Sequence, residues 1–260
     1  MTEECPREFI DFAATLADAA RPIVSRHFRA PLTIDRKSDD TPVTIADRDA
    51  ETAMRTLIEE RYPQHGIIGE EHGVRAGDAE FVWVLDPIDG TKAFIAGKPM
   101  FGTLIALVRG GVPILGVIDQ PVLGERWIGA TGTDTIFNGK PIRTRACTGI
   151  DQAILNTTSP DLFAGDDAVR FARMRKSVWQ TQYGGDCYAY GLLASGFLDF
   201  VVEADLKPYD FSALIPIVSG AGGAVSDWNG EAIHLASDGR IVAAGNPALL
   251  PRAVEILNSP

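Results

Sequence analysis

Apolar residues at helical spacing open the chain. They recur every three or four positions from Phe9 to Val24, and a second pattern of this kind runs from about Ile45 to Tyr62, just before Pro63. This recurrence places apolar side chains on one face of a helix, and a proline ends the pattern. The sequence therefore predicts two amphipathic helices at the start of the chain.

Short apolar runs punctuated by glycine and proline follow these helices. Such runs are typical of β-strands, and they stand at 66–69, 81–85, 103–108, 113–118 and 125–130. Only short turn-forming segments separate the last three runs. We therefore expect these three to form an antiparallel meander.

The pattern changes beyond residues 143–149. Strand-like runs now alternate with stretches of helical spacing, the strands at 153–158, 177–182, 198–203, 223–228 and 241–246 and the helices near 166–175, 186–195, 210–221 and 247–258. Alternation of this kind is typical of α/β architecture. We predict an N-terminal α+β half over residues 1–145 and a C-terminal α/β half over residues 146–260.

Composition narrows the class of protein. The chain has 260 residues, 45% of them hydrophobic, which is enough for a large core. Its net charge of -11, with no basic stripe, argues against a nucleic-acid partner. Three widely spaced cysteines without a CxxC motif suggest neither disulfides nor a thiolate zinc site. Because the chain shows no basic and apolar leader and no long apolar run, we expect no membrane partner and a cytoplasmic location.

The segment VLDPIDGT at 84–91 ends an apolar strand in two carboxylates. A strand that is apolar on both faces is covered on both sides, so Asp86 is expected where the sheet delivers the chain to a crevice. A cation between Asp86 and Asp89 would keep both ionised. The amides of Gly90 and Thr91 would suit a phosphate. An ordinary solvated turn uses the same residue types and stays an alternative at this point.

Other carboxylates stand at strand ends and helix starts. Glu70 and Glu71 follow the run at 66–69, whereas Asp47 and Asp210 begin helical patterns and could be simple helix-terminal residues. The four histidines form no ligand motif. A set of acids without histidine or cysteine ligands favours a hard, oxygen-ligated ion such as Mg²⁺.

The motifs resemble, in order, those of the inositol monophosphatase superfamily of Mg²⁺-dependent, lithium-sensitive phosphatases. The matching segments are VTIAD at 43–47, GEE at 69–71, DPIDGTKAF at 86–94 and YDFSALIPIVSGAGG at 209–223. The resemblance implies a layered αβαβα sandwich of the sugar-phosphatase type and hydrolysis of a small phosphate monoester. It also implies a homodimer, since many relatives complete the site with a neighbouring subunit.

The resemblance further implies the roles of individual residues around two or three Mg²⁺ ions. The implied metal ligands are Glu70, Asp86, the carbonyl of Ile88, Asp89 and Asp210. The implied catalytic residues are Asp47 and Thr91, which would polarise the attacking water, and Lys37, which would lie near this water and the phosphate. The implied substrate-binding residues are Asp89, Gly90, Thr91, Gly184, Gly185, Asp186, Glu203 and Asp210.

Within the superfamily, residues 183–214 are most similar to the histidinol-phosphate phosphatases. Tyr209 stands where the broader family usually has a tryptophan, which weakens the expectation of inositol specificity. Histidinol carries an ammonium and an imidazole, and the carboxylates of Asp186 and Glu203 suit both through charge-assisted hydrogen bonds. Asp186 could instead cap the helix that begins at Cys187.

Three alternatives remain open from the sequence. The first is an inositol-1-monophosphatase or a broader sugar phosphatase with the same metal core. The second is a non-enzymatic anion-binding protein on the same fold, since a fold does not fix an activity. The third is a haloacid-dehalogenase-type phosphatase, whose DxDGT loop is one residue shorter than the DxxDGT of Asp86 and Asp89, so the second acid would use a different face.

Overall fold

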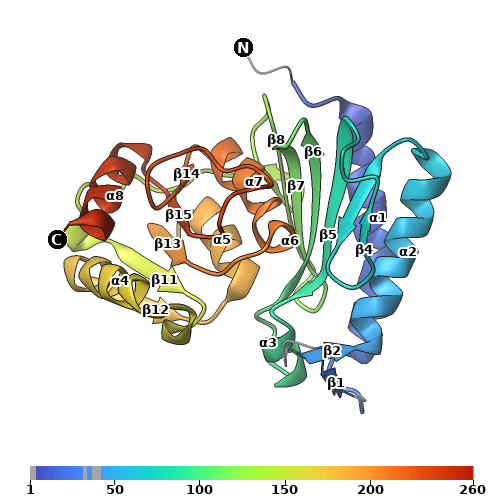
Figure 1. Ribbon diagram of the computed structural model, residues 1–260, viewed down its shortest axis with the longest axis horizontal. Coiled ribbons are helices and arrows are strands. Elements are labelled where there is room, and N and C mark those ends of the chain that lie inside the picture. The colour runs from blue at the N-terminus through green and yellow to red at the C-terminus, as the bar shows by residue number, and fades with distance from the viewer. Residues whose placement is uncertain (1–3, 32–33, 37–41, 260) are drawn as a thin grey trace.

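Five layers of helices and sheets make up the molecule, in the order αβαβα (Figure 1). The computed structural model describes residues 4–31, 34–36 and 42–259, so Lys37 lies outside the described residues. Helices α1 and α2 cover one face of a large sheet, α5 and α7 lie between this sheet and a second one, and α4 and α8 form the outer layer (Figure 1). The predicted layered sandwich is confirmed.

The first helical layer matches the predicted pair. Helix α1 (Arg7–His27) and helix α2 (Ile45–Arg61) pack against each other and against the central strands of the large sheet. Their buried faces carry the apolar residues of the helical pattern, such as Leu16 and Met54. Helix α1 extends beyond the predicted span at both ends and contains Pro22.

The large sheet has eight strands in the order β10-β9-β8-β7-β6-β5-β3-β4. Its strands are β3 (Gly66–Gly69), β4 (Gly73–Arg75), β5 (Phe81–Asp89), β6 (Gly102–Arg109), β7 (Val112–Gln120), β8 (Glu125–Ala130), β9 (Ile136–Phe137) and β10 (Lys140–Pro141). Strands β5 to β8 are antiparallel, which confirms the predicted meander, and β3 lies parallel to β5. A separate two-stranded sheet joins β1 (Ile34–Arg36) to β2 (Pro42–Thr44).

The second sheet has five strands in the order β12-β11-β13-β15-β14. They are β11 (Ile154–Thr157), β12 (Gln180–Tyr183), β13 (Phe200–Glu203), β14 (Ala224–Asp227) and β15 (Ile241–Ala244), at the predicted positions. Strands β12, β11 and β13 are parallel, as α/β alternation requires, whereas β14 and β15 are antiparallel. Parallel neighbouring strands need a crossover connection, usually a helix. No described helix joins β14 to β15, and these two strands pair antiparallel.

The remaining helices connect the two sheets and cover them. They are α3 (Thr91–Ile95), α4 (Asp166–Ser177), α5 (Asp186–Ala194), α6 (Pro208–Phe211), α7 (Leu214–Gly220) and α8 (Leu250–Asn258). Among the described residues, no helix is long and apolar enough to cross a membrane.

Helix α7 approaches the large sheet through two glycines. A Cβ atom at Gly116 would lie 1.9 Å from the carbonyl oxygen of Ala213, and one at Gly129 would lie 2.5 Å from the Cα of Ile217. The backbone of α7 therefore rests directly on β7 and β8. One apolar cluster includes residues from both sides of this contact, such as Trp127 and Ile217. The predicted boundary near residue 145 falls between β10 and β11, and the division into two domains stays a prediction.

Candidate active site

Three carboxylates from two elements meet near one end of β5. One oxygen of each of Asp86, Asp89 and Asp210 lies within 4.8 Å of the others. Asp86 is buried, whereas Asp89 and Asp210 are partly exposed to a cavity. Strand β5 supplies the first two and helix α6 supplies the third, so the structure brings together three of the predicted metal ligands.

The backbone of β5 turns irregularly between its two acids. Asp86 pairs with Leu104 of β6 and Asp89 with Gly102, with a shift in register between them. The amide of Ile88 donates to Oδ1 of Asp86 at 3.0 Å, which holds this carboxylate in the bend. The strand thus continues four residues past the predicted end at Leu85, and the irregularity turns the chain toward the cavity.

The residues after this bend begin helix α3. The hydroxyl of Thr91 donates to the carbonyl of Ile88 at 3.0 Å. Gly90 has a φ of 87°, which is in the left-handed region, and a Cβ there would lie 3.0 Å from both Cγ of Asp186 and the carbonyl oxygen of Met100. Glycine is therefore required at position 90 for conformation and for space.

Asp47 lies in the first turn of α2, with one oxygen held and one left without a partner. The backbone amide and the hydroxyl of Thr44 donate to its Oδ2 at 2.8 and 2.6 Å. Its Oδ1 is buried and has no hydrogen-bond partner among the described residues. Burial first, and then the charge of Glu70, raise the pKa of Asp47. A buried, unpaired carboxylate oxygen is costly, so this atom is suited to a ligand.

Without a cation, burial and mutual repulsion raise the pKa values of the carboxylates in the acid cluster. Burial, followed by the charges of Glu70, Asp89 and Asp210, raises the pKa of Asp86 well above its usual value. Burial and the charges of Asp186 and Asp210 do the same for Asp89. Burial raises the pKa of Asp210 to about 7, although the amide of Lys207 donates to it at 2.6 Å. The donor set fits a hard divalent cation, which would keep these carboxylates ionised.

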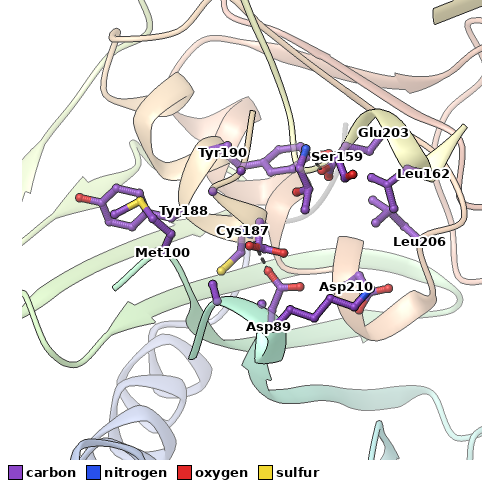
Figure 2. A pocket seen from close by; sticks show the side chains of 18 of the residues that line it. Asp89, Met100, Ser159, Leu162, Cys187, Tyr188, Tyr190, Glu203, Leu206 and Asp210 are labelled. Carbon is purple, nitrogen blue, oxygen red and sulfur yellow. Dashed lines mark hydrogen bonds between the residues drawn. The ribbon is translucent and has the colours of Figure 1, made fainter. Parts of the chain in front are cut away.

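Helix α5 begins beside Asp89, whose Oδ2 accepts a hydrogen bond from the amide of Cys187 at 2.5 Å (Figure 2). The N-cap residue of this helix is Gly185, and Asp186 is the first residue of the helix itself. The alternative that Asp186 caps the helix is therefore wrong, because Asp89 takes that place. The carboxylate of Asp186 lines the cavity instead.

A cavity of about 1070 Å³ opens in front of the acid cluster. Eleven of the predicted site residues line it, namely Glu70, Asp86, Ile88, Asp89, Gly90, Thr91, Gly184, Gly185, Asp186, Glu203 and Asp210. Asp47 is fully buried behind this surface. The position of Lys37 is outside the described residues.

Two carboxylates face the cavity from the C-terminal half. Glu203, at the end of β13, is buried and accepts hydrogen bonds from the amide of Thr158 at 3.1 Å and the hydroxyl of Tyr190 at 3.0 Å. Burial raises the pKa of Glu203. Burial first, and then the charge of Glu203, raise the pKa of Asp186 to about 7, and Lys92 opposes this rise.

Sequence reasoning missed several residues that line the cavity around Glu203. Tyr190, Ser159, Leu162 and Leu206 surround Glu203 at the same end of the cavity (Figure 2). Tyr190 lies four residues after Asp186, and this spacing indicates that the two side chains share one face of the helix. Leu162 and Leu206 follow no periodic pattern that points to a cavity, so the sequence alone gives no signal for them.

Known proteins match the chain along nearly its whole length. A sequence model of the inositol monophosphatase family matches residues 6–259. A bifunctional phosphatase, IMPL2 of Arabidopsis thaliana chloroplasts, is 49% identical over 99% of this chain and 79% of its own length. A histidinol-phosphatase of Chlorobaculum parvum is 34% identical over 91% of this chain and 92% of its own.

Solved structures agree with these sequence matches. An inositol monophosphatase from Zymomonas mobilis superposes with a TM-score of 0.89 at 50% identity, over 96% of this chain and 98% of its own. The haloacid-dehalogenase alternative is therefore set aside. The fold, the order of the motifs and the convergence of their acids agree with these matches, and the chain belongs to the inositol monophosphatase family of phosphatases.

Proposed function

We propose that this protein is a Mg²⁺-dependent phosphomonoesterase that hydrolyses L-histidinol phosphate to L-histidinol and phosphate. The observation that carries the substrate assignment is the pair of carboxylates, Asp186 and Glu203, that lines the same cavity as the acid cluster. Histidinol-phosphatases among its relatives support the proposal. The reaction would place this phosphatase in histidine biosynthesis.

Five residues would hold two or three Mg²⁺ ions. Glu70, Asp86 and the carbonyl of Ile88 would hold the first ion. Asp86, Asp89 and Asp210 would hold the second, and Glu70 would help to hold a third. When bound, Mg²⁺ lowers the pKa of water and neutralises negative charge on the leaving oxygen, so no covalent enzyme intermediate is needed.

Two side chains of this protein would activate the attacking water. Thr44 holds Oδ2 of Asp47, which leaves Oδ1 to accept a proton of the water. The hydroxyl hydrogen of Thr91 is committed to the carbonyl of Ile88, so its oxygen is left as an acceptor. Together they would orient the water toward phosphorus. Lys37 stays a predicted contributor near the water and the phosphate.

The amides of Gly90 and Thr91 would bind phosphate oxygens. They lie at the start of α3, where backbone N–H groups lack partners within the helix. Lys92 and Lys98 also line the cavity and reduce its negative potential. The acidic chain would thus receive an anion through a locally compensated surface.

The side of the cavity that carries Asp186 and Glu203 would select the alcohol part of the substrate. The ammonium of histidinol would pair with Asp186 and Glu203, and the oxygens of Glu203 keep a lone pair each beyond their bonds to Thr158 and Tyr190. A neutral inositol ring would bring no positive charge to these carboxylates, which is costly for buried groups. Gly184 and Gly185 would line the path of the alcohol without obstructing it.

Phosphate release from a small panel tests this proposal. The panel contains L-histidinol phosphate, inositol 1-phosphate, fructose 1,6-bisphosphate and an aryl phosphate, each with Mg²⁺ and with EDTA. We expect strong preference for histidinol phosphate and no release with EDTA. Release dominated by inositol or sugar phosphates would overturn the substrate assignment, and release unaffected by EDTA would overturn the metal site.

An inositol or sugar phosphatase is the second candidate. The size of the cavity, about 1070 Å³, would admit larger alcohols than histidinol. The 50% identical structure from Zymomonas mobilis is that of an inositol monophosphatase. The same panel distinguishes the two candidates.

A homodimer is also proposed. Trp179, directly before the edge strand β12, is 67% exposed, and Tyr183, at the end of this strand, is 47% exposed. Among the described strands, β12 pairs with β11 alone. Tyr183 also lines the cavity, so a second copy covering this edge would extend the substrate wall. Sedimentation velocity should show a dimer that Trp179→Glu weakens, and a monomeric wild-type protein would contradict the proposal.

A further inference from the structure

Glu51 is a fully buried carboxylate that none of the proposed chemical steps uses. It lies on α2, one turn after Asp47 and on the same face of the helix. Its Oε1 accepts a hydrogen bond from Nε of Arg55 at 2.6 Å, so its charge is compensated within the helix. Because a buried ion pair of this kind is a weak source of stability, another role should be sought.

The carboxylate of Glu51 holds the turn between β3 and β4. Its Oε2 accepts from the amide of Glu71 at 2.8 Å, and its Oε1 accepts from the amide of His72 at 3.1 Å. The guanidinium of Arg55 donates to the carbonyl of Gly73 at the far end of the same turn. Helix α2 therefore holds three consecutive residues, Glu71, His72 and Gly73, which immediately follow Glu70.

Gly69 allows this grip. A Cβ at position 69 would lie 2.0 Å from Oε1 and 2.4 Å from Cδ of Glu51. The backbone of Gly69 thus runs directly against the carboxylate, and any side chain at position 69 would displace it. The GEE motif at 69–71 therefore needs its glycine to give Glu51 access to the turn.

Glu70 is fixed from both sides as a result. Its own amide donates to the carbonyl of Leu85 at 3.2 Å, and Leu85 directly precedes Asp86. The next amide in the chain, that of Glu71, donates to Glu51. The backbone of Glu70 is thus held between the strand that carries Asp86 and the helix that carries Asp47.

We propose that Glu51 is a positioning residue that sets the place of Glu70 relative to Asp86, and thereby the affinity of the site for Mg²⁺. The inference rests on the proposed metal-dependent hydrolysis. Partners behind the direct ligands of a metal typically change its affinity by about 10 to 100-fold. Glu51 acts through the backbone of the turn and not through contact with metal or substrate.

The test is Glu51→Gln, with Mg²⁺ binding measured by calorimetry on the metal-free protein. A glutamine replaces one acceptor oxygen by a donor, which must then face either the amide of Glu71 or both the amide of His72 and Arg55. We expect the Kd for Mg²⁺ to rise about tenfold or more, while kcat recovers at saturating Mg²⁺. We also expect faster hydrogen exchange at the amides of Glu71 and His72.

Glu60→Gln is the matched control, because Glu60 is exposed on the same helix and the substitution removes the same charge. It should leave the Mg²⁺ affinity unchanged. Gly69→Ala is the second variant, since its methyl group displaces the carboxylate of Glu51 while leaving Arg55 in place. It should weaken Mg²⁺ binding as Glu51→Gln does, and thermal unfolding in EDTA shows which variants are folded.

Either of two results from a folded variant would overturn the inference. The first is Mg²⁺ affinity equal to that of the wild-type protein, and the second is a lower kcat that saturating Mg²⁺ does not restore. The proposed substrate is judged separately. If the wild-type protein binds Mg²⁺ but releases no phosphate from histidinol phosphate, the substrate assignment fails while the calorimetry still decides the role of Glu51.

Discussion

The two acidic walls of the cavity are held in place by different kinds of contact. On the metal wall, formed by Glu70, Asp86, Asp89 and Asp210 with Asp47 buried behind them, three carboxylates accept hydrogen bonds from amides two or three residues away in the chain. On the substrate wall, formed by Asp186 and Glu203, the carboxylate of Glu203 is held by Thr158, 45 residues away. Local contacts therefore hold three carboxylates of the first wall, whereas tertiary contacts hold Asp89 and the second wall.

The residues proposed for the chemical step and those proposed for substrate specificity are therefore held by different contacts. A carboxylate that bonds to its own loop depends less on the packing of distant elements. The substrate wall depends on how β11, β13 and α5 pack together, so substitutions in β11 and β13 can change the alcohol, whereas α5 also contacts Asp89 of the metal site through the amide of Cys187. Relatives with the same metal core and different substrates are expected from this arrangement.

The largest effect should come from Asp86, the buried acid shared by both proposed metal sites. Asp86→Asn should lower kcat at least about a thousandfold, because several kcal/mol of charge stabilisation are lost from the transition state. Mg²⁺ binding should weaken at the same time. Steady-state rates and calorimetry on the same preparation check both, and near-normal turnover would show that the metal wall is misassigned.

The next effect concerns the water-activating pair. Thr91→Ala should lower kcat about a hundredfold, since a positioned proton acceptor typically contributes this much or more. Mg²⁺ affinity should change less than in Asp86→Asn, because the hydroxyl of Thr91 bonds to the Ile88 carbonyl without itself being a proposed ligand. Equal losses of kcat and metal affinity would instead make Thr91 a structural support of the metal wall.

The substrate wall should respond in KM and not in metal binding. Asp186→Asn should raise KM for L-histidinol phosphate about tenfold or more, the effect of losing one charge-assisted hydrogen bond. KM for an aryl phosphate should stay nearly constant. Parallel saturation curves with both substrates check this, and equal shifts would argue against a role for Asp186 in recognising the alcohol.

The smallest effect is a dependence of stability on pH in the metal-free protein. The folded-state pKa of Asp210 and of Asp186 is raised to about 7, above the ordinary value of 3.8. Between these values the folded state binds more protons than the unfolded state, so stability falls as pH rises toward 7. In EDTA, Tm should rise by a few degrees on going from about pH 8 to about pH 5.5.

Mg²⁺ should reverse this trend, because it binds the ionised carboxylates and competes with protons. Differential scanning calorimetry with and without Mg²⁺ checks the prediction. Repeating it with Asp186→Asn removes the contribution of Asp186 and leaves that of Asp210. A Tm that falls with acid in EDTA would contradict the direction of these pKa shifts.

Apolar patterning predicted the helices of the first layer, five strands of the large sheet and the strands of the second sheet, because these patterns follow from burial on one or both faces. The short strands β4, β9 and β10 carry no such pattern and were not predicted. The metal wall was predictable, since its acids sit at strand ends and helix starts. Two features of the site were not. Strand β5 continues to Asp89 because pairing with β6 resumes after the irregularity, and Asp89 caps α5 from 98 residues away.

Glu51 shows the limit most clearly. Its sequence context is an ordinary amphipathic helix, and a carboxylate there indicates a solvated position. Only the packing of α2 against the turn at 70–72 reveals two backbone amides aimed at it. Long-range contacts of this kind leave no local signal in the chain.

The central claim is that one wall hydrolyses the ester while the other selects a cationic alcohol. The most direct test is the ratio of kcat/KM for L-histidinol phosphate to that for inositol 1-phosphate, at saturating Mg²⁺, in the wild-type protein and in Asp186→Asn/Glu203→Gln. We predict a large ratio that collapses toward unity in the variant, with turnover of an aryl phosphate retained. A wild-type ratio at or below unity, or one that survives the double substitution, would contradict the account.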